Sequence, residues 1–446
     1  MHNKLICVLL AICVGSLAFA GKPEITNNGM FYIYSFFWQN GDFNADIPDF
    51  PDQAEGDQFF YMHADIGIHA DFGAGVSTQV TVGGWGTFGV HPITAEGDQG
   101  GTPGENVAVR EAYIDFANLF DSPLSFRAGK MHVLYPGQVF DGGEDGAMGA
   151  KFYGSTDMID YDLAWYRLIE NGGCWCAGMG PVEDDLDLFA AYFTAKFMEG
   201  GVRLSPYWFW RTISGTTEID TLMYETKDDP MWLGGRLDVG PLAGLSLSGE
   251  FTMMMGSYEV DTMALDYAGM HYMGKLSYAP PTLPVMLGGG YYAFTGDEYD
   301  TLGFTGDENE LYESPIWGPY TNDFFNWWPA FGPAHLHKTA YGFNLLAPFD
   351  MYATNLTVIN GNIGFHQGPF MLRGDFFKYT RSWVPDGISD DMGMEISVLA
   401  TYTYRKTITV GATAGYWMPG DWQTDFYGAD YEDAMLAGWL FTYISF

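Results

Sequence analysis

The sequence predicts an all-β protein: a transmembrane antiparallel β-barrel of about eighteen strands, in a single domain that covers residues 21–446. Polar and apolar residues alternate along many segments, most clearly in 62–72, where Ile66 and Ile68 fall on one side and Asp65 on the other. The last stretch, 434–446, is an apolar strand that ends on an aromatic residue and must be paired and covered. The 58 glycines and 17% aromatic residues suit crowded strand crossings and aromatic girdles at membrane interfaces.

The first twenty residues carry the features of a secretory signal. Lys4 precedes an apolar run that ends at Leu17, and Ala18-Phe19-Ala20 forms a small-x-small cleavage site. We therefore expect a signal peptide over residues 1–20 and export through the periplasm to the bacterial outer membrane. No later window has the roughly 18 to 20 consecutive apolar residues of a spanning helix, which excludes a helical membrane protein.

Strands are expected wherever an alternating segment is bounded by Gly, Pro, Asn or Asp. The first nine are 30–39, 58–72, 76–90, 106–117, 124–132, 146–154, 158–170, 184–197 and 202–211. Short connections rich in turn residues join them in pairs at 73–75, 118–123, 155–157 and 198–201.

The last nine expected strands follow the same rule. They are 231–239, 245–257, 264–278, 284–295, 352–365, 370–380, 392–404, 407–418 and 434–446. Their short turns are at 240–243, 279–283, 366–369 and 405–406.

The connections decide the number of strands. Eight short turns and nine longer, acidic connections join eighteen strands, with both chain ends on the short-turn side, as a single-chain outer-membrane barrel requires. Residues 337–346 could form a further strand, but the count would then be odd, so we assign them to a long loop over about residues 296–351. Sixteen strands remain the main alternative, because boundaries judged from one sequence err by several residues.

If the apolar side of the strands faces lipid, the other side lines a lumen with charges of both signs. The pore-lining candidates on that side are Glu111, Asp115, Arg127, Lys151, Arg203, Arg211, Arg236, Glu250, Lys275, Arg373, Asp375 and Glu395. A barrel of this size is too wide for side chains to fill, so water or a folded-in loop must occupy it. The charges either pair within the wall and hold neighbouring strands together, or a subset lines a constriction and sets selectivity.

The chain is strongly acidic. It has 56 Asp and Glu against 19 Lys and Arg, a net charge of −37, which makes nucleic acid a poor partner. The excess carboxylates lie in the predicted loops, so we expect a vestibule that concentrates cations and repels polyanions. The long loop is also rich in aromatic residues, which favours its folding over or into the pore, by packing on the barrel or as a platform that stacks on sugars.

Few residues are candidates for a cofactor or a covalent link. Cys174 and Cys176 can form a small disulfide, remain a free pair or contribute to a metal site, and we favour the disulfide. The acidic clusters at 141–146 and 307–310 could hold Ca²⁺ in a loop, although neither has EF-hand spacing. We expect no other cofactor and no other metal.

Two stretches resemble known barrels. Residues Arg110-Glu111-Ala112-Tyr113-Ile114-Asp115, then the segment 124–130 and Tyr135-Pro136-Gly137, resemble the central pattern of the alginate-export family, and the ending at Phe446 resembles the signal read by the barrel-assembly machinery. The first resemblance implies an eighteen-stranded outer-membrane barrel with a substrate-selective passage and adds Arg110 and Lys130 to Arg127 as candidate pore-lining cations. Both added residues fall on the apolar side, so they need a bulge at Gly129 or a position at the outer rim.

The leading functional hypothesis is a porin-like channel for passive passage of small solutes or saccharides, selective by size and charge and favouring cations or neutral solutes. The alternatives are an export barrel for an alginate-like polysaccharide, which needs a more basic constriction, and a plugged barrel whose loops bind a partner. Outer-membrane lipid and lipopolysaccharide are the expected surroundings. We do not expect an enzyme. A membrane hydrolase needs a histidine held by a hydrogen bond, but His63 and Asp65, two residues apart on a strand, are expected to lie about 6.5 to 7 Å apart, beyond hydrogen-bond reach.

Overall fold

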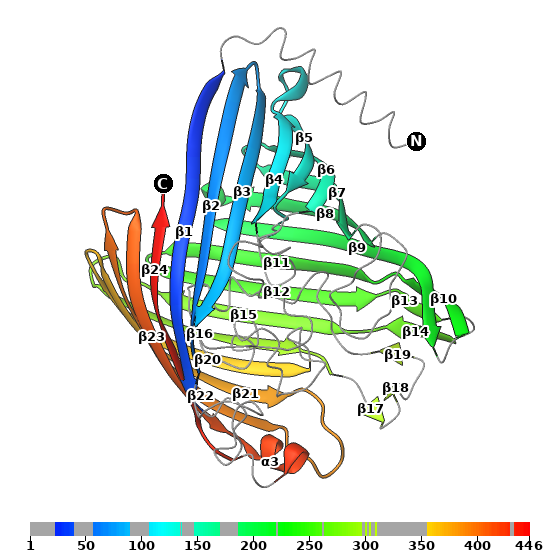
Figure 1. Cartoon of the computed structure of the whole chain (residues 1–446), viewed down its shortest axis with the longest axis vertical. Helices are drawn as coiled ribbons and strands as arrows, with labels where there is room; N and C mark the ends of the chain where they lie inside the picture. Colours follow the sequence, from blue (N-terminus) through cyan, green and yellow to red (C-terminus); the bar gives the residue numbers. More distant parts are fainter. Residues whose placement is uncertain are drawn as a thin grey trace.

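The structure is a computed structural model in which nearly all described residues belong to strands of one closed barrel (Figure 1). The residues that it describes are 23–39, 57–89, 107–133, 135, 147–169, 186–219, 222–260, 263–296, 299–300, 303–304, 308–309, 355–428 and 432–446. The predicted signal peptide and most of the predicted loop over 296–351 lie outside these ranges. Within them, no helix combines the length and the apolar character needed to cross a bilayer.

Eighteen strands form the wall, each antiparallel to the next, and the last pairs with the first. They are β1 (Glu24–Gln39), β2 (Asp57–Gly73), β3 (Val76–Gly89), β4 (Val107–Phe116), β5 (Leu124–Met131), β6 (Ala147–Ser155), β7 (Ile159–Ile169), β8 (Leu186–Phe197), β9 (Val202–Ile219), β11 (Met231–Leu242), β12 (Leu245–Met255), β15 (Met270–Tyr278), β16 (Val285–Phe294), β20 (Leu356–Gln367), β21 (Phe370–Arg381), β22 (Asp391–Tyr404), β23 (Ile408–Pro419) and β24 (Met435–Ser445). The predicted eighteen-stranded barrel is confirmed, and the sixteen-stranded alternative is wrong.

Several short elements lie outside the wall and were not predicted. They are β10 (Leu222–Asp228), β13 (Ser257–Val260), β14 (Met263–Tyr267), β17 (Tyr299–Asp300), β18 (Gly303–Phe304), β19 (Glu308–Asn309), the 3-10 turns η1 (Leu119–Asp121) and η2 (Met198–Gly200), and the helix α3 (Asp421–Tyr427). Strand β10 arises where a wall strand outruns its neighbour. Beyond Trp210, β9 loses β11 as a partner and pairs with β10 instead, which keeps its backbone hydrogen-bonded.

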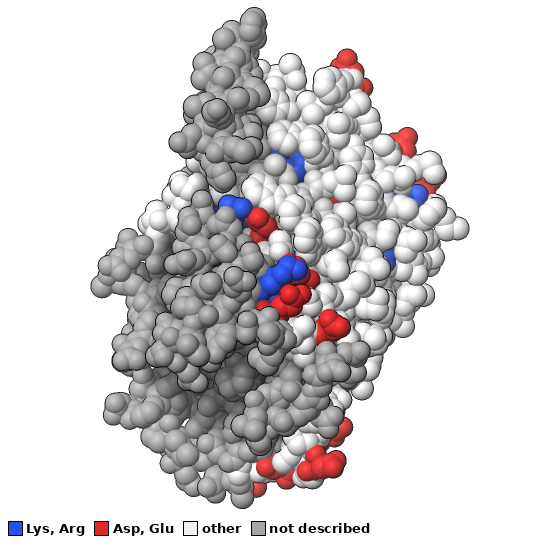
Figure 2. Space-filling view, turned by 90° about the vertical axis from the view of Figure 1, so that its right-hand side faces the viewer, with Lys and Arg blue, Asp and Glu red and all other residues white. Residues whose placement is uncertain are grey.

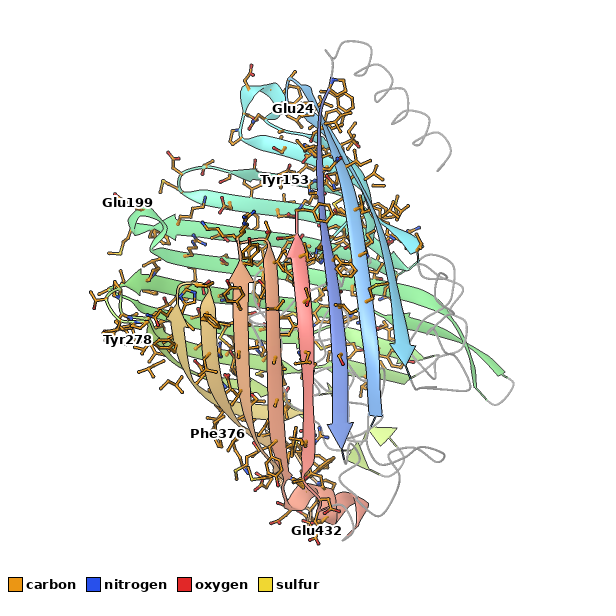
Figure 3. All side chains as sticks on the ribbon, turned by 60° about the vertical axis from the view of Figure 1, so that its left-hand side comes forward. Glu24, Tyr153, Glu199, Tyr278, Phe376 and Glu432 are labelled. Atoms are coloured by element: carbon orange, nitrogen blue, oxygen red, sulfur yellow. The ribbon has the colours of Figure 1, made fainter. Side chains whose placement is uncertain are left out.

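The two ends of the barrel differ. The eight predicted short turns all lie at one end, where residues such as Gly73, Ala74 and Gly75 adopt positive φ angles. The long connections leave from the other end. Figure 3 shows Glu199 and Tyr278 at the short-turn end and Glu432, beside α3, at the opposite end.

The side chains alternate as the sequence predicts. Outward-facing Ile66, Ile363 and Leu440 are 60%, 61% and 59% exposed, whereas inward-facing His63 and Asp65 are buried. In Figure 3, outward-facing Phe376 points away from the barrel, and Figure 2 shows a described surface with few charged residues, gathered in small groups. An exposed apolar surface around a closed barrel is the pattern of a membrane-spanning barrel.

Candidate functional site

The inward-facing side of the wall carries the predicted charged residues. The strand registers place on it Glu111, Asp115, Arg127, Lys151, Arg203, Arg211, Arg236, Glu250, Lys275, Arg373, Asp375 and Glu395. They come from nine strands between β4 and β22. That these residues line the path of a solute stays a prediction.

Arg110 also points into the barrel, because β4 has a bulge at this residue. Thr81 pairs with Glu111 and Val82 with Val109, so Arg110 is the extra residue on its strand. Its side chain is buried, and its Nε lies 3.3 Å from Oδ1 of Asp65 on β2. The bulge that we expected at Gly129 is therefore at Arg110 itself.

Lys130 faces outward. It lies opposite Ala112 on β4 and Met148 on β6, and Met148 is 54% exposed. Gly129 has a φ of 130°, yet the inward and outward positions keep their order on either side of it. Lys130 was expected as a pore-lining cation, but its side chain points away from the lumen, at the position next to the last residue of β5.

Two ion pairs connect the strands from β4 to β7 across the inner wall. Arg127 Nη2 lies 2.6 Å from Asp115 Oδ2, and Lys151 Nζ lies 2.7 Å from Asp162 Oδ2. Tyr153 also donates a hydrogen bond to Asp115, at 2.7 Å. The guanidinium of Arg127 also lies 4.1 Å from the centre of the Tyr113 ring. This cation–π contact adds to the ion pair with Asp115 in holding the positive charge.

A second cluster lies on β9, β11 and β12. Arg236 Nε lies 2.8 Å from Asp238 Oδ2, and its Nη1 lies 3.4 Å from Glu250 Oε2. The hydroxyl of Tyr207 donates to Glu250 at 2.9 Å, and that of Ser248 donates to Asp238 at 2.6 Å. One cation thus compensates two carboxylates in a site where Arg236 and Glu250 are buried.

Two further arginines are paired in the same way. Arg373 Nη2 lies 2.8 Å from Asp375 Oδ1 on β21, and Arg211 Nη2 lies 2.9 Å from Asp228 Oδ2 at the long-connection end of β9. These contacts favour the interpretation of the wall charges as ion pairs between or along strands. The described charges of the inner wall are therefore largely balanced by one another.

Tyr135 packs against the inner face of β7, β8 and β9. The chain turns inward after β5, so that the hydroxyl of Tyr135 donates to Asp162 at 2.9 Å and its ring lies 5.2 Å from that of Phe209 and 5.4 Å from that of Tyr192. The inner wall at β16 and β20 carries small and amide residues instead, including Gly288, which has no room for a Cβ beside Asn362. Sequence analysis missed this role because Tyr135 lies outside any alternating segment.

His63 and Asp65 correct an expectation drawn from strand spacing. His63 Nε2 lies 2.9 Å from Asp65 Oδ1, and its Nδ1 lies 2.7 Å from the Tyr32 hydroxyl. The spacing argument considered backbone positions only, whereas side chains lean along the strand toward each other. Asp65 also contacts Arg110, so this buried network joins β1, β2 and β4.

Glu395 is an inward-facing carboxyl group that is almost completely buried in the barrel wall. It is 1% exposed; Tyr379 donates to its Oε2 at 3.3 Å, and its Oε1 has no hydrogen-bond partner among the described residues. Glu395→Gln removes the cost of burying an ionisable carboxyl group at nearly constant volume, so it should raise the free energy of unfolding at neutral pH by about 1–3 kcal/mol. Urea titration of the refolded barrel, followed by tryptophan fluorescence, measures this; Glu395→Gln unfolding at lower urea would contradict it.

The metal and disulfide expectations stay untested. Among the residues that the structure describes, no three His, Cys, Asp or Glu side chains are grouped to hold a metal ion. Cys174, Cys176 and the acidic cluster at 141–146 lie outside the described residues, as do Asp307 and Glu310 of the cluster at 307–310.

No protein-family model matches the chain, and no curated protein matches it by sequence. Its structure is similar to that of OpdK from Pseudomonas aeruginosa, determined with vanillate, with a TM-score of 0.57 at 9% identity over 95% of this chain and 98% of that one. The comparison with a BenF-like porin from Pseudomonas fluorescens Pf-5 gives a TM-score of 0.55 at 11% identity, over 95% of this chain and 99% of that one. The comparison with OccAB1 from Acinetobacter baumannii gives a TM-score of 0.54 at 11% identity, over 94% of this chain and 96% of that one. The fold is therefore that of these outer-membrane porins, whereas membership of the alginate-export family is not shown.

Proposed function

We propose that this protein is a channel of the bacterial outer membrane through which small solutes pass passively. The observation that carries the proposal is the closed barrel wall, apolar outside and lined inside by ion-paired charges. Such a wall sits stably in lipid and keeps a polar surface on its inner side. The shared fold with porins supports the same function, and none of these features implies a reaction.

The channel should favour cations or neutral solutes over anions. The described cations of the inner wall are largely matched by carboxylates, so they form no basic track for a polyanion such as alginate. The chain as a whole has 56 acidic against 19 basic residues, and the excess negative charge attracts cations to the mouths of the pore. Neutral saccharides are compatible with the same lining.

Conductance of the refolded protein in a planar bilayer tests the function. Under a KCl gradient at neutral pH, we expect open channels whose reversal potential shows K⁺ favoured over Cl⁻ roughly fivefold. That ratio corresponds to about 1 kcal/mol, the effect of one uncompensated carboxylate about 4 Å from an ion in water.

The other outcomes each favour another function. Anion selectivity would support polyuronate export, because the inner arginines would then outweigh the acidic residues. Absence of conductance would support a plugged barrel that acts through its surface. Raising the salt concentration should reduce the cation selectivity, because salt screens the fixed charges, while open channels should still be observed.

The proposed location and function imply four kinds of partner. The exposed apolar band contacts membrane lipid, and the long-connection end faces lipopolysaccharide of the outer leaflet. The apolar strand β24 is the segment offered to the barrel-assembly machinery after export by the signal peptide over residues 1–20. A small solute or saccharide is the cargo, and we propose neither a cofactor nor a nucleic-acid partner.

A further inference from the structure

We propose that the outer wall of β5 to β7 binds a phosphate group of lipopolysaccharide through Lys130 and Arg167. The inference rests on the outer-membrane location proposed above but not on the passage of any solute. It assigns a binding role to Lys130, a residue of the segment 124–130 that does not face the lumen.

The outward-facing cations of the wall lie at one end of the barrel. Among the described wall strands, the Lys and Arg side chains on the outward side are Lys130, Arg167 and Lys378. Each lies within the last four residues of its strand, at the end from which a long connection leaves. In outer-membrane barrels the longer connections are extracellular, so this edge of the apolar band meets the outer leaflet.

Lys130 and Arg167 are neighbours across one strand. Both lie directly opposite Met148 of β6, so their backbones are two strand spacings, about 10 Å, apart. The structure shows no hydrogen bond or ion pair from Lys130 to another described residue. Arg167 is held in place by Asp187 of β8, with Nε 3.0 Å from Oδ1 and Nη2 3.1 Å from Oδ2. The patch therefore keeps a net positive charge at Lys130, among outward-facing side chains that are mostly apolar.

Aromatic residues place this patch at the depth of lipid headgroups. Outward-facing Trp165, Phe189 and Trp210 are paired in register, and the rings of Phe189 and Trp210 stack at 5.1 Å. They belong to β7, β8 and β9, which are neighbouring strands (Figure 1). The guanidinium of Arg167 lies 5.7 Å from the Trp165 ring. Tryptophan gathers at the interface between hydrocarbon and headgroups, where a lysine can reach a phosphate while its stem stays in the apolar layer. An uncompensated ammonium at this depth needs an anion, and the outer leaflet supplies phosphates.

Lipopolysaccharide titration of the refolded full chain in a neutral detergent tests the site, with the shift in thermal unfolding as the readout. Lys130→Gln should weaken the apparent affinity about fivefold, and adding Arg167→Gln, which removes a second positive charge, should weaken it about twenty-five-fold in total, as expected for about 1 kcal/mol per cation near an anionic membrane surface. Lys130→Arg should restore wild-type affinity. Arg405→Gln, in a turn at the opposite end, is the matched control and should leave the affinity unchanged.

Two further ligands identify the source of the phosphate. Dephosphorylated lipopolysaccharide should bind the wild-type protein as weakly as intact lipopolysaccharide binds Lys130→Gln, and inorganic phosphate should give no shift. The proposal would be overturned if Lys130→Gln and Arg405→Gln lost affinity for lipopolysaccharide equally. It would also be overturned if the wild-type protein bound intact and dephosphorylated lipopolysaccharide with equal affinity. A shift with inorganic phosphate would overturn the assignment to lipid. A barrel that does not conduct would give the same titration, so failure of the channel function is distinguishable.

Discussion

Arg236→Met should lower the free energy of unfolding by about 3–5 kcal/mol, because it removes the cation that contacts the buried carboxylate of Glu250. Arg236 is the cation that contacts both Glu250 and Asp238, and the Glu250 side chain has no exposed surface. The hydrogen bond from Tyr207 remains, but a hydroxyl does not neutralise a carboxylate. Urea titration of the refolded barrel by tryptophan fluorescence measures the change.

A double variant separates charge compensation from packing. Arg236→Met with Glu250→Met removes both buried charges, and we expect it to recover most of the stability lost in Arg236→Met. If the double variant is as unstable as Arg236→Met, the loss comes from packing around the guanidinium, and the ion pair does not stabilise this part of the wall.

Gly129→Ala should destabilise the barrel by about 3 kcal/mol or more. Gly129 has a φ of 130°, which residues with a Cβ rarely adopt, and an added Cβ would lie 2.2 Å from the carbonyl oxygen of Ala112 and 2.7 Å from the Cα of Tyr113. Both contacts are with backbone atoms of β4, so relief requires separation of two paired strands. The fraction of heat-modifiable, folded protein after refolding and the midpoint of urea unfolding measure the effect.

Gly361→Ala on β20 is the control for that variant. An added Cβ at Gly361 meets no atom within 4 Å, so we expect a change within about 0.5 kcal/mol. Equal effects of the two substitutions would mean that the backbone conformation and close approach at Gly129 are unimportant for stability.

Strand number and orientation could be predicted because a barrel wall repeats one simple pattern. Ile66, Ile68 and Leu440 face outward as the period of two requires, and each expected wall strand has a counterpart in the structure. The predicted strand over 264–278 is divided into β14 and β15, since the alternating pattern does not mark where a strand leaves the wall.

The details of the site depend on features that the alternation does not encode. Arg110 turns inward through a single extra residue, which reverses the side expected from its position. Tyr135 reaches strands β7 to β9 from a non-strand segment. The contact between His63 and Asp65 depends on how two side chains lean, which backbone spacing does not determine. Lys130 remained outward because Gly129 adopts its unusual φ without inserting a residue.

The pairing of β24 with β1 has a consequence for how the barrel forms. Its register runs from Met30 opposite Ser445 to Gln39 opposite Leu436, and Gly29 and Phe446 exchange backbone hydrogen bonds. These contacts join residues almost a whole chain length apart, and contacts of such large sequence separation make folding slow. Until they form, the sheet has two open edges that can pair with other chains. Pairing of β24 with β1 is thus expected to be a slow step of barrel formation. Until it is complete, the unfinished barrel must be shielded from self-association.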